Sequence, residues 1–168
     1  MELIRTEELE KIYHDNGVPV HALYGVSITI RKGEFTVIAG PSGSGKTTLL
    51  NLIGALDAPS AGSVMFEGEN VASKSKTELA SLRLHRMGFI FQAYNLIPVL
   101  TARENIEFTM MLLQISERER RRRTLALMEE LGIAELADKR PNEMSGGQQQ
   151  RVAVARAIVT NPSLVLAD

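Results

Sequence analysis

The chain has 168 residues, of which 44% are hydrophobic and 23% are charged, enough to fold one globular domain with its own core. Its formal net charge of −1 gives no bulk attraction to nucleic acid or to an anionic membrane surface. Because the sequence contains no cysteine, disulfides and thiolate metal sites are excluded. The polar first residues do not resemble a signal peptide and no apolar run is long enough to cross a bilayer, so we expect a cytoplasmic chain.

The first half of the chain predicts two strands and a helix around a glycine-rich turn. Residues 26–30 alternate between apolar and polar, the period of a half-buried strand. Residues 35–39 form a continuous apolar run, which is typical of a strand buried on both faces. Beyond the turn, Leu49, Leu50 and Ile53 recur at helical spacing. The predicted order is therefore strand, strand, loop and helix.

The second half predicts two more short strands with helices between them. Residues 87–91 and 164–167 are apolar runs of strand length. Thr101 and Glu104 have capping-box spacing and predict the start of a helix. Because apolar strands alternate with helices, the pattern favours a parallel sheet covered on both faces.

An arginine-rich helix is predicted next. Residues 117–123 contain five arginines and two glutamates, and Leu125, Met128 and Leu131 follow at helical spacing before Gly132 ends the helix. Such a run could bind nucleic acid, but its acidic neighbours and the nearly neutral chain favour a solvated helix face. No nucleic-acid partner is expected.

The strongest chemical signal is the stretch GPSGSGKT at residues 40–47, which matches the phosphate-loop pattern between a predicted strand and a predicted helix. Glycines let the backbone N–H groups approach phosphate oxygens, and the helix that follows directs the positive end of its dipole at the anion. Lys46 supplies a charge for the β- and γ-phosphates, and the Thr47 hydroxyl suits Mg²⁺. The alternative is a glycine-rich turn that only caps a helix.

A second stretch, SGGQ at residues 145–148, begins a helix that carries Val152, Ala155 and Val159 on one face. The first and last residues of the stretch form a capping box, so helix initiation alone could explain them. The two glycines remain unexplained by that alternative, because each weakens the first turn by roughly 1 kcal/mol relative to alanine. They favour close approach of a phosphate to the backbone.

With these two motifs in this order, the chain resembles the nucleotide-binding domain of an ATP-binding-cassette (ABC) transporter. Residues 40–47 correspond to its Walker A motif, and residues 145–148 to its signature, with Met144 where leucine is more usual. The stretches FQAYNLIP at 91–98 and LTAREN at 100–105, with the triple glutamine at 148–150, resemble the branch of lipoprotein-release and macrolide-efflux exporters.

The resemblance implies an α/β fold of the P-loop NTPase class. It predicts an ABC-type core with a mainly parallel sheet, an antiparallel N-terminal β part and a helical subdomain that carries the signature. Residues 1–168 would form one ATP-binding domain. Within it, residues 1–92 would be the first half of the nucleotide-binding core, residues 93–150 the helical subdomain, and residues 151–168 the return to the core, ending at the Walker B aspartate.

The resemblance also implies ATP and Mg²⁺ as cofactors and a role for each matching residue. Tyr13 would stack on adenine, Gln92 would meet Mg²⁺ and the attacking water, and Asp168 would hold Mg²⁺ after an apolar strand of the Walker B type. The implied catalytic residues are Lys46, Gln92 and Ser145, and the implied metal ligands are Thr47, Gln92 and Asp168. The implied nucleotide contacts are Tyr13, Gly40, Pro41, Ser42, Gly43, Ser44, Gly45, Lys46, Thr47, Thr48, Ser145, Gly146, Gly147 and Gln148.

The implied function is an ATPase subunit that powers an exporter. Two copies would form an ATP-dependent head-to-tail homodimer, in which the signature of one chain contacts the γ-phosphate held by the other. Membrane permease subunits would hold this dimer at the cytoplasmic face of the membrane. Two alternatives stay open: a non-transport ABC ATPase, and a nucleotide-binding fragment without turnover.

The sequence stops at Asp168, where the family continues with a water-polarising glutamate, a loop to the second subunit and a histidine. We therefore expect an incomplete chain whose turnover is impaired, because orienting groups carry much of phosphoryl transfer. The family also places a further strand between the Walker A and Walker B strands, so we expect a gap in the sheet there.

Overall fold

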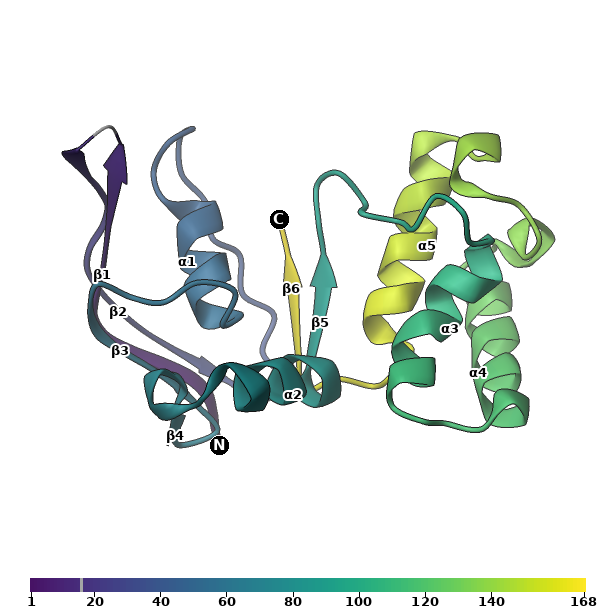
Figure 1. The fold of residues 1–168 in the computed structure, drawn as a ribbon, viewed down its shortest axis with the longest axis horizontal. Coiled ribbons are helices and arrows are strands. Elements are labelled where there is room, and N and C mark those ends of the chain that lie inside the picture. The colour runs from purple at the N-terminus through teal and green to yellow at the C-terminus, as the bar shows by residue number, and fades with distance from the viewer. Residues whose placement is uncertain (16) are drawn as a thin grey trace. The chain divides into compact units, whose positions relative to one another are not determined.

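The structure is a computed structural model that describes residues 1–15 and 17–168. It divides into two compact units, Met1–Ser81 and Leu82–Asp168, both drawn in Figure 1. Each unit contains its own secondary structure and buried side chains, so each is described by itself. The predicted division at residues 92 and 150 remains a prediction.

The first unit is built on a four-stranded antiparallel sheet in the order β2-β1-β3-β4. In the register, Ile4 of β1 lies opposite Ile30 of β2 on one side and Phe66 of β3 on the other, and all three are buried. The predicted strand at residues 26–30 lies within β2, and the antiparallel N-terminal β part is confirmed. The strands are β1 (Glu2–Asp15), β2 (Val18–Arg31), β3 (Ala61–Phe66) and β4 (Glu69–Asn70).

Three helices accompany this part of the chain. Helix α1 (Lys46–Ile53) follows the glycine-rich turn, as predicted, and buries Leu49 and Leu52 on one side. Leu50, which was expected on that face, is only half-buried. A short 3₁₀ helix, η1 (Val71–Ser73), precedes α2 (Lys76–Arg86), which continues into the second unit.

The strand predicted at residues 35–39 is not formed. None of the described strands pairs with it, and it appears in Figure 1 as an irregular connection before α1. Phe35 is 92% exposed and Val37 is 73% exposed, whereas the apolar run predicted burial on both faces. An apolar run becomes a buried strand only where neighbouring strands take up its N–H and C=O groups.

The second unit contains a parallel pair of strands, β5 (Met87–Ile90) and β6 (Leu164–Ala167), which lie side by side in Figure 1. Met87 pairs with Leu164 at one end and Ile90 with Ala167 at the other. The predictions at residues 87–91 and 164–167 are therefore confirmed to within one residue. Because the pair is parallel, the residues that follow both strands lie at the same edge.

Helices α3, α4 and α5 pack around a buried apolar cluster in the second unit (Figure 1). Met128 and Val152 of the predicted stripes are fully buried in it, and Ile106 and Met110 of α3 are fully buried beside them. Leu125 departs from its predicted stripe and is 37% exposed. The elements are α3 (Ala102–Leu112), α4 (Glu117–Glu130), η2 (Ala134–Leu136), η3 (Pro141–Glu143) and α5 (Gly146–Ile158). Within the described residues, no helix is both long and apolar enough to span a bilayer.

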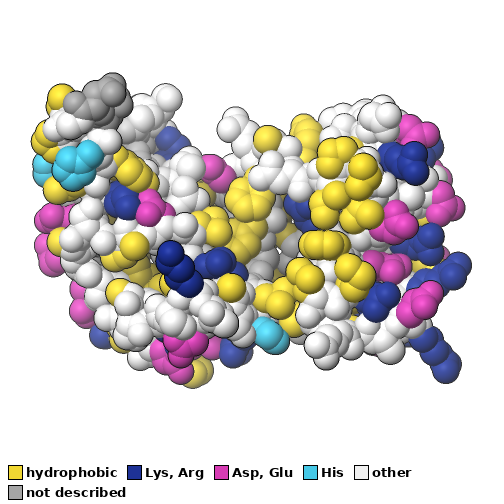
Figure 2. All heavy atoms as spheres, in the orientation of Figure 1, with side chains coloured by type: hydrophobic (Ala, Val, Ile, Leu, Met, Phe, Trp, Pro, Cys, Tyr) yellow, Lys and Arg dark blue, Asp and Glu magenta, His cyan; other side chains and the backbone are white. Residues whose placement is uncertain are grey.

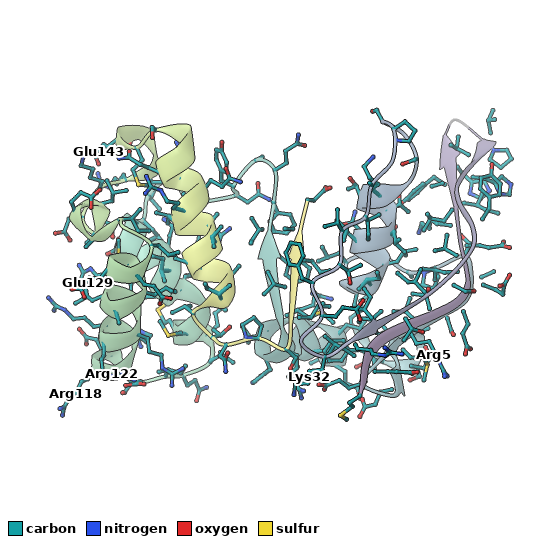
Figure 3. All side chains as sticks on the ribbon, turned by 180° about the vertical axis from the view of Figure 1, so that it is seen from behind. Arg5, Lys32, Arg118, Arg122, Glu129 and Glu143 are labelled. Atoms are coloured by element: carbon teal, nitrogen blue, oxygen red, sulfur yellow. The ribbon has the colours of Figure 1, made fainter. Side chains whose placement is uncertain are left out.

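The arginine-rich face of α4 is a solvated face with internal ion pairs. Glu119 accepts hydrogen bonds from Arg122 at 2.7 Å and from Arg123 at 2.7 Å. Figure 3 shows the Arg118 and Arg122 side chains directed outward from the helix. In Figure 2, basic and acidic side chains are intermixed over this part of the unit and do not form a basic stripe. The predicted solvated face is therefore confirmed except at Arg120, whose side chain is only 19% exposed and donates to the Ile115 carbonyl.

Candidate functional site

The glycine-rich loop at residues 40–47 leads directly into α1 in the first unit. Gly45 is the N-cap residue and has a left-handed backbone with φ 86°, which an L side chain rarely adopts. A Cβ atom here would overlap the Ala22 carbonyl oxygen. Lys46 folds back over the loop, where its Nζ donates hydrogen bonds to the carbonyl oxygens of Gly40 at 2.9 Å and Pro41 at 2.8 Å.

The local chemistry of this loop suits a phosphate group. No acidic residue lies in the first turn of α1, so the positive end of the helix dipole is not neutralised locally. Gly43 has φ 80°, and a Cβ atom built on it would meet no heavy atom within 4 Å. The backbone is therefore open to close approach by an anion where the motif predicts it.

Residues 145–148 open α5 in the second unit. Ser145 is the N-cap residue and forms the predicted capping box: its hydroxyl accepts from the Gln148 N–H, and the Gln148 side chain accepts from the Ser145 N–H. A Cβ atom on Gly146 would lie 3.1 Å from the Tyr94 hydroxyl, whereas one on Gly147 would meet no heavy atom within 4 Å. Gly147 therefore leaves the backbone open at the start of a helix.

Gln92 and Asp168 follow the two parallel strands of the second unit. The Asp168 N–H donates to the Ile90 carbonyl at 3.0 Å, and Gln92 lies two residues beyond Ile90. Both predicted Mg²⁺ ligands therefore belong to one edge of the β5–β6 pair (Figure 1). Amide and carboxylate oxygens are ligands that Mg²⁺ accepts. Among the described residues, no group of three His, Asp or Glu side chains could hold a metal.

Tyr13 lies on β1 and is tied to residues that the sequence analysis missed. Its hydroxyl donates to Asp57 Oδ2 at 2.8 Å, and the Lys11 ammonium lies 4.8 Å from the centre of its ring. Lys11 also donates to Asp57 Oδ1 at 2.8 Å. Because Asp57 is more than forty positions from both partners, only the folded chain reveals this cluster.

The turn after Gln92 is held by α5 in a way that no sequence pattern indicated. Tyr94 and Asn95 have positive φ values of 59° and 47°, and their carbonyls accept hydrogen bonds from Arg156 at 2.8 and 2.6 Å. Further along, fully buried Asn105 of α3 accepts from the Ile97 N–H at 2.7 Å. Two helices therefore fix the segment between Gln92 and α3.

Comparison with known families decides the class of protein. Residues 23–168 match the family model described as "ABC transporter", a range that includes residues 40–47 and 145–148. The chain belongs to the ABC transporter family. Its ATP-binding domain is the part represented here, and the α/β P-loop fold of that domain agrees with the structure.

The curated relatives of this ABC chain place it among ATP-binding proteins of transporters. It is 48% identical to an uncharacterized ABC transporter ATP-binding protein of Thermotoga maritima, over its whole length and 70% of that protein. It is 45% identical to the macrolide export ATP-binding/permease protein MacB of Brucella melitensis, over 99% of the chain and 26% of the relative. The chain thus spans about a quarter of that relative's length.

Solved ABC cassettes share the fold. The dimeric post-hydrolysis structure of the ATP-binding cassette MJ0796, bound to ADP and Pi, matches with a TM-score of 0.93 and 41% identity. The match covers 99% of this chain and 73% of that cassette. The resemblance to an ABC ATP-binding domain is therefore confirmed in both sequence and structure.

Proposed function

We propose that the chain binds Mg-ATP on residues 40–48 and belongs to an ATPase that powers transport. The observation that carries this proposal is the loop before α1, where Lys46 lies over the carbonyls of Gly40 and Pro41. An ammonium already held at the loop needs only to exchange carbonyl partners for phosphate oxygens. The similar MJ0796 cassette is bound to ADP and Pi, which supports the same ligand class.

The proposed Mg²⁺ ligands are the Thr47 hydroxyl, the Gln92 amide oxygen and the Asp168 carboxylate. Bound Mg²⁺ would neutralise part of the phosphate charge that develops in phosphoryl transfer. Lys46 contributes a second positive charge at the phosphates, and Gln92 is proposed to orient the attacking water. Support comes from each unit by itself: Thr47 lies in the first turn of α1 in the first unit, and Gln92 and Asp168 follow β5 and β6 in the second.

The proposed active form is an ATP-dependent homodimer arranged head to tail. In this form, Ser145 and Gly147 of one chain face the γ-phosphate bound by its partner. The open backbone at Gly147 and the free positive end of α5, whose first turn lacks acidic residues, support this role. The MJ0796 structure is dimeric, which supports such an assembly.

We propose membrane permease subunits as further partners, with the domain peripheral at the cytoplasmic face of the membrane. The relative MacB is named as a macrolide export ATP-binding/permease protein, which supports an exporter over a non-transport ABC ATPase. Export of a specific substrate would depend on membrane segments outside an ATP-binding domain.

The test is a titration of the 168-residue chain with Mg-ATP, followed by measurement of phosphate release. We expect binding that Lys46→Ala weakens roughly tenfold or more, because the charge facing the phosphates is lost. Lys32→Ala, an exposed lysine of the same unit, is the matched control and should bind like the unaltered chain. Equal affinity in the Lys46 variant would contradict the proposed loop. Binding without phosphate release would support the nucleotide-binding alternative over turnover by this chain.

A further inference from the structure

The Tyr13 side chain is held by its neighbours although it is partly exposed. Its hydroxyl is bonded to Asp57, and the Lys11 ammonium lies over one face of the ring. The ring is nevertheless 39% exposed. An exposed tyrosine usually rotates about two side-chain torsions, and a bonded hydroxyl with a covered face restricts both.

Asp57 is itself fixed on several sides. Its Oδ1 accepts from Lys11 at 2.8 Å and from the Ala58 N–H at 2.7 Å, and its Oδ2 accepts from Tyr13. Its own N–H donates to the Asn51 carbonyl of α1 at 3.3 Å. Lys11 donates a further bond to the Ala58 carbonyl at 2.7 Å. The carboxylate is therefore a rigid anchor for the phenol.

The charge state of this anchor follows from the same contacts. Burial alone would raise the pKa of the Asp57 carboxyl, but hydrogen bonds from Lys11, Tyr13 and the Ala58 N–H outweigh burial, and the pKa lies below its usual range. Asp57 is thus a carboxylate at neutral pH. Lys11 is only 12% exposed and neutralises it.

The network also reaches the phosphate-binding helix. Tyr13 also interacts with the side chain of Thr48, which lies in the first turn of α1 next to Thr47. Tyr13 is thus linked to the first turn of α1 and, through its hydroxyl, to Asp57, which lies beyond the last turn of that helix. A base stacked on the Tyr13 ring and phosphates bound by residues 40–47 would both lie close to α1. One nucleotide could therefore reach both places.

We propose that Asp57 and Lys11 are positioning residues that hold the Tyr13 ring for the adenine base of ATP. This inference rests on the proposed binding of ATP at residues 40–48. Lys11 occupies one ring face, and adenine takes the opposite face. Because the ring is held before binding, less torsional freedom is lost when the base stacks.

Comparison of two ligands tests the inference in the 168-residue chain by calorimetry. Mg-ATP carries the base, whereas Mg-tripolyphosphate reports on the phosphate loop alone. We expect Asp57→Ala and Tyr13→Phe each to weaken Mg-ATP binding about three- to tenfold, the range for immobilising one side chain on binding. Binding of Mg-tripolyphosphate should stay unchanged. Asp57→Asn, which keeps an acceptor for the phenol, should recover part of the loss.

Controls separate positioning from general stability. Glu7→Ala removes an exposed carboxylate from the same strand and should leave both affinities unchanged. The double variant Tyr13→Ala with Asp57→Ala should bind Mg-ATP as weakly as Tyr13→Ala alone, because Asp57 acts through the ring. If Asp57→Ala unfolds, Tyr13→Phe still tests the anchor.

The outcomes distinguish this inference from the proposed function. If Asp57→Ala weakened binding of Mg-ATP and Mg-tripolyphosphate equally, the positioning role alone would be overturned. The same would follow if Asp57→Ala kept the Mg-ATP affinity of the unaltered chain while Tyr13→Ala lost affinity. A chain that binds neither ligand would overturn the proposed function and this inference together. An unaltered chain that binds both ligands equally would show that the base is not held, and would overturn the role of the ring.

Discussion

Gly45 determines how α1 leaves the phosphate loop. Its φ of 86° belongs to the left-handed region, and a methyl group would overlap the Ala22 carbonyl and approach Leu23 Cδ2 to 2.8 Å. We expect Gly45→Ala to lower the free energy of unfolding by about 1–3 kcal/mol and to weaken Mg-ATP binding, because the loop must shift to relieve the overlap. Urea unfolding and a nucleotide titration measure the two effects.

Gly43→Ala is the matched control for this prediction. Gly43 has a similar φ of 80°, but its Cβ atom would meet no heavy atom within 4 Å. Its unfolding free energy should fall less than that of Gly45→Ala, since only backbone strain is added. Equal losses in the two variants would mean that the Ala22 contact does not shape the loop.

Glu119, in the first turn of α4, predicts a pH effect on stability. Hydrogen bonds from Arg122, then from Arg123, lower the pKa of Glu119 from 4.5 to about 2. A depressed pKa stabilises the fold fully above about pH 4.5, and the contribution is lost as pH falls toward 2. We therefore expect Glu119→Gln to flatten the dependence of the urea midpoint on pH in this window.

Two controls test this pH effect: removal of a different carboxylate on α4, and addition of salt. Glu129→Gln alters another exposed carboxylate of α4, labelled in Figure 3, and should keep the slope of the unaltered chain. The difference between the Glu119 variant and the unaltered chain should be small and should shrink in about 1 M salt, because exposed ion pairs are screened (Debye length about 3 Å). If the urea midpoint depended on pH equally in the Glu119→Gln variant and the unaltered chain, ionisation of Glu119 would not contribute to stability.

Arg156 connects α5 to the turn after Gln92. Burial lowers the pKa of its guanidinium, which is held by the carbonyls of Tyr94 and Asn95. We expect Arg156→Ala to cost about 1–3 kcal/mol of stability, because those carbonyls lose a charged donor. Amide hydrogen exchange should rise locally in residues 93–97.

Arg151→Ala is the comparison for Arg156. Arg151 lies on the same helix and donates to the carbonyls of Leu131 and Gly132 at 3.5 and 3.3 Å, which are longer contacts. Its loss should leave exchange in residues 93–97 unchanged. If amide exchange in residues 93–97 were the same in the Arg156→Ala and Arg151→Ala variants, Arg156 would not hold the turn.

The elements differ in how far the sequence could predict them. Capping boxes at Thr101 and Ser145 were confirmed, because each depends on groups within four residues of one another. The run at residues 35–39 has the composition of a buried strand but no described strand beside it, and is irregular. Composition shows that a segment can enter a sheet, whereas partners distant in the sequence decide whether it does.

At the scale of the whole molecule, some residues of the candidate site could be predicted from the sequence and others could not. Residues 40–47 were predictable as a unit, because one contiguous motif holds both the loop and the helix start. Gln92 and Asp168 were predicted through a family resemblance, and the parallel pairing of β5 and β6 supplies the physical reason that both reach one edge. Asp57 could not be found, because no periodicity connects it to Tyr13.

The proposed homodimer predicts a separation between nucleotide binding and assembly. Gly147 is the second residue of α5, and a side chain built there meets no heavy atom within 4 Å. Gly147→Asp should therefore fit the monomer, and a carboxylate near a helix N-terminus is favourable. Facing the partner's γ-phosphate, however, the same charge would be repelled. We expect unchanged monomer affinity for Mg-ATP and loss of ATP-dependent dimers in sedimentation velocity.

Gly147→Asn separates charge from size in this experiment. Asparagine has nearly the same shape as aspartate without its charge, so it should weaken dimers less, and the difference should narrow as salt screens the repulsion. An aspartate variant that forms ATP-dependent dimers as readily as the unaltered chain would mean that the start of α5 does not face a phosphate. Equal loss of dimers in both variants would assign the effect to bulk at a close backbone approach, which still places Gly147 in the interface.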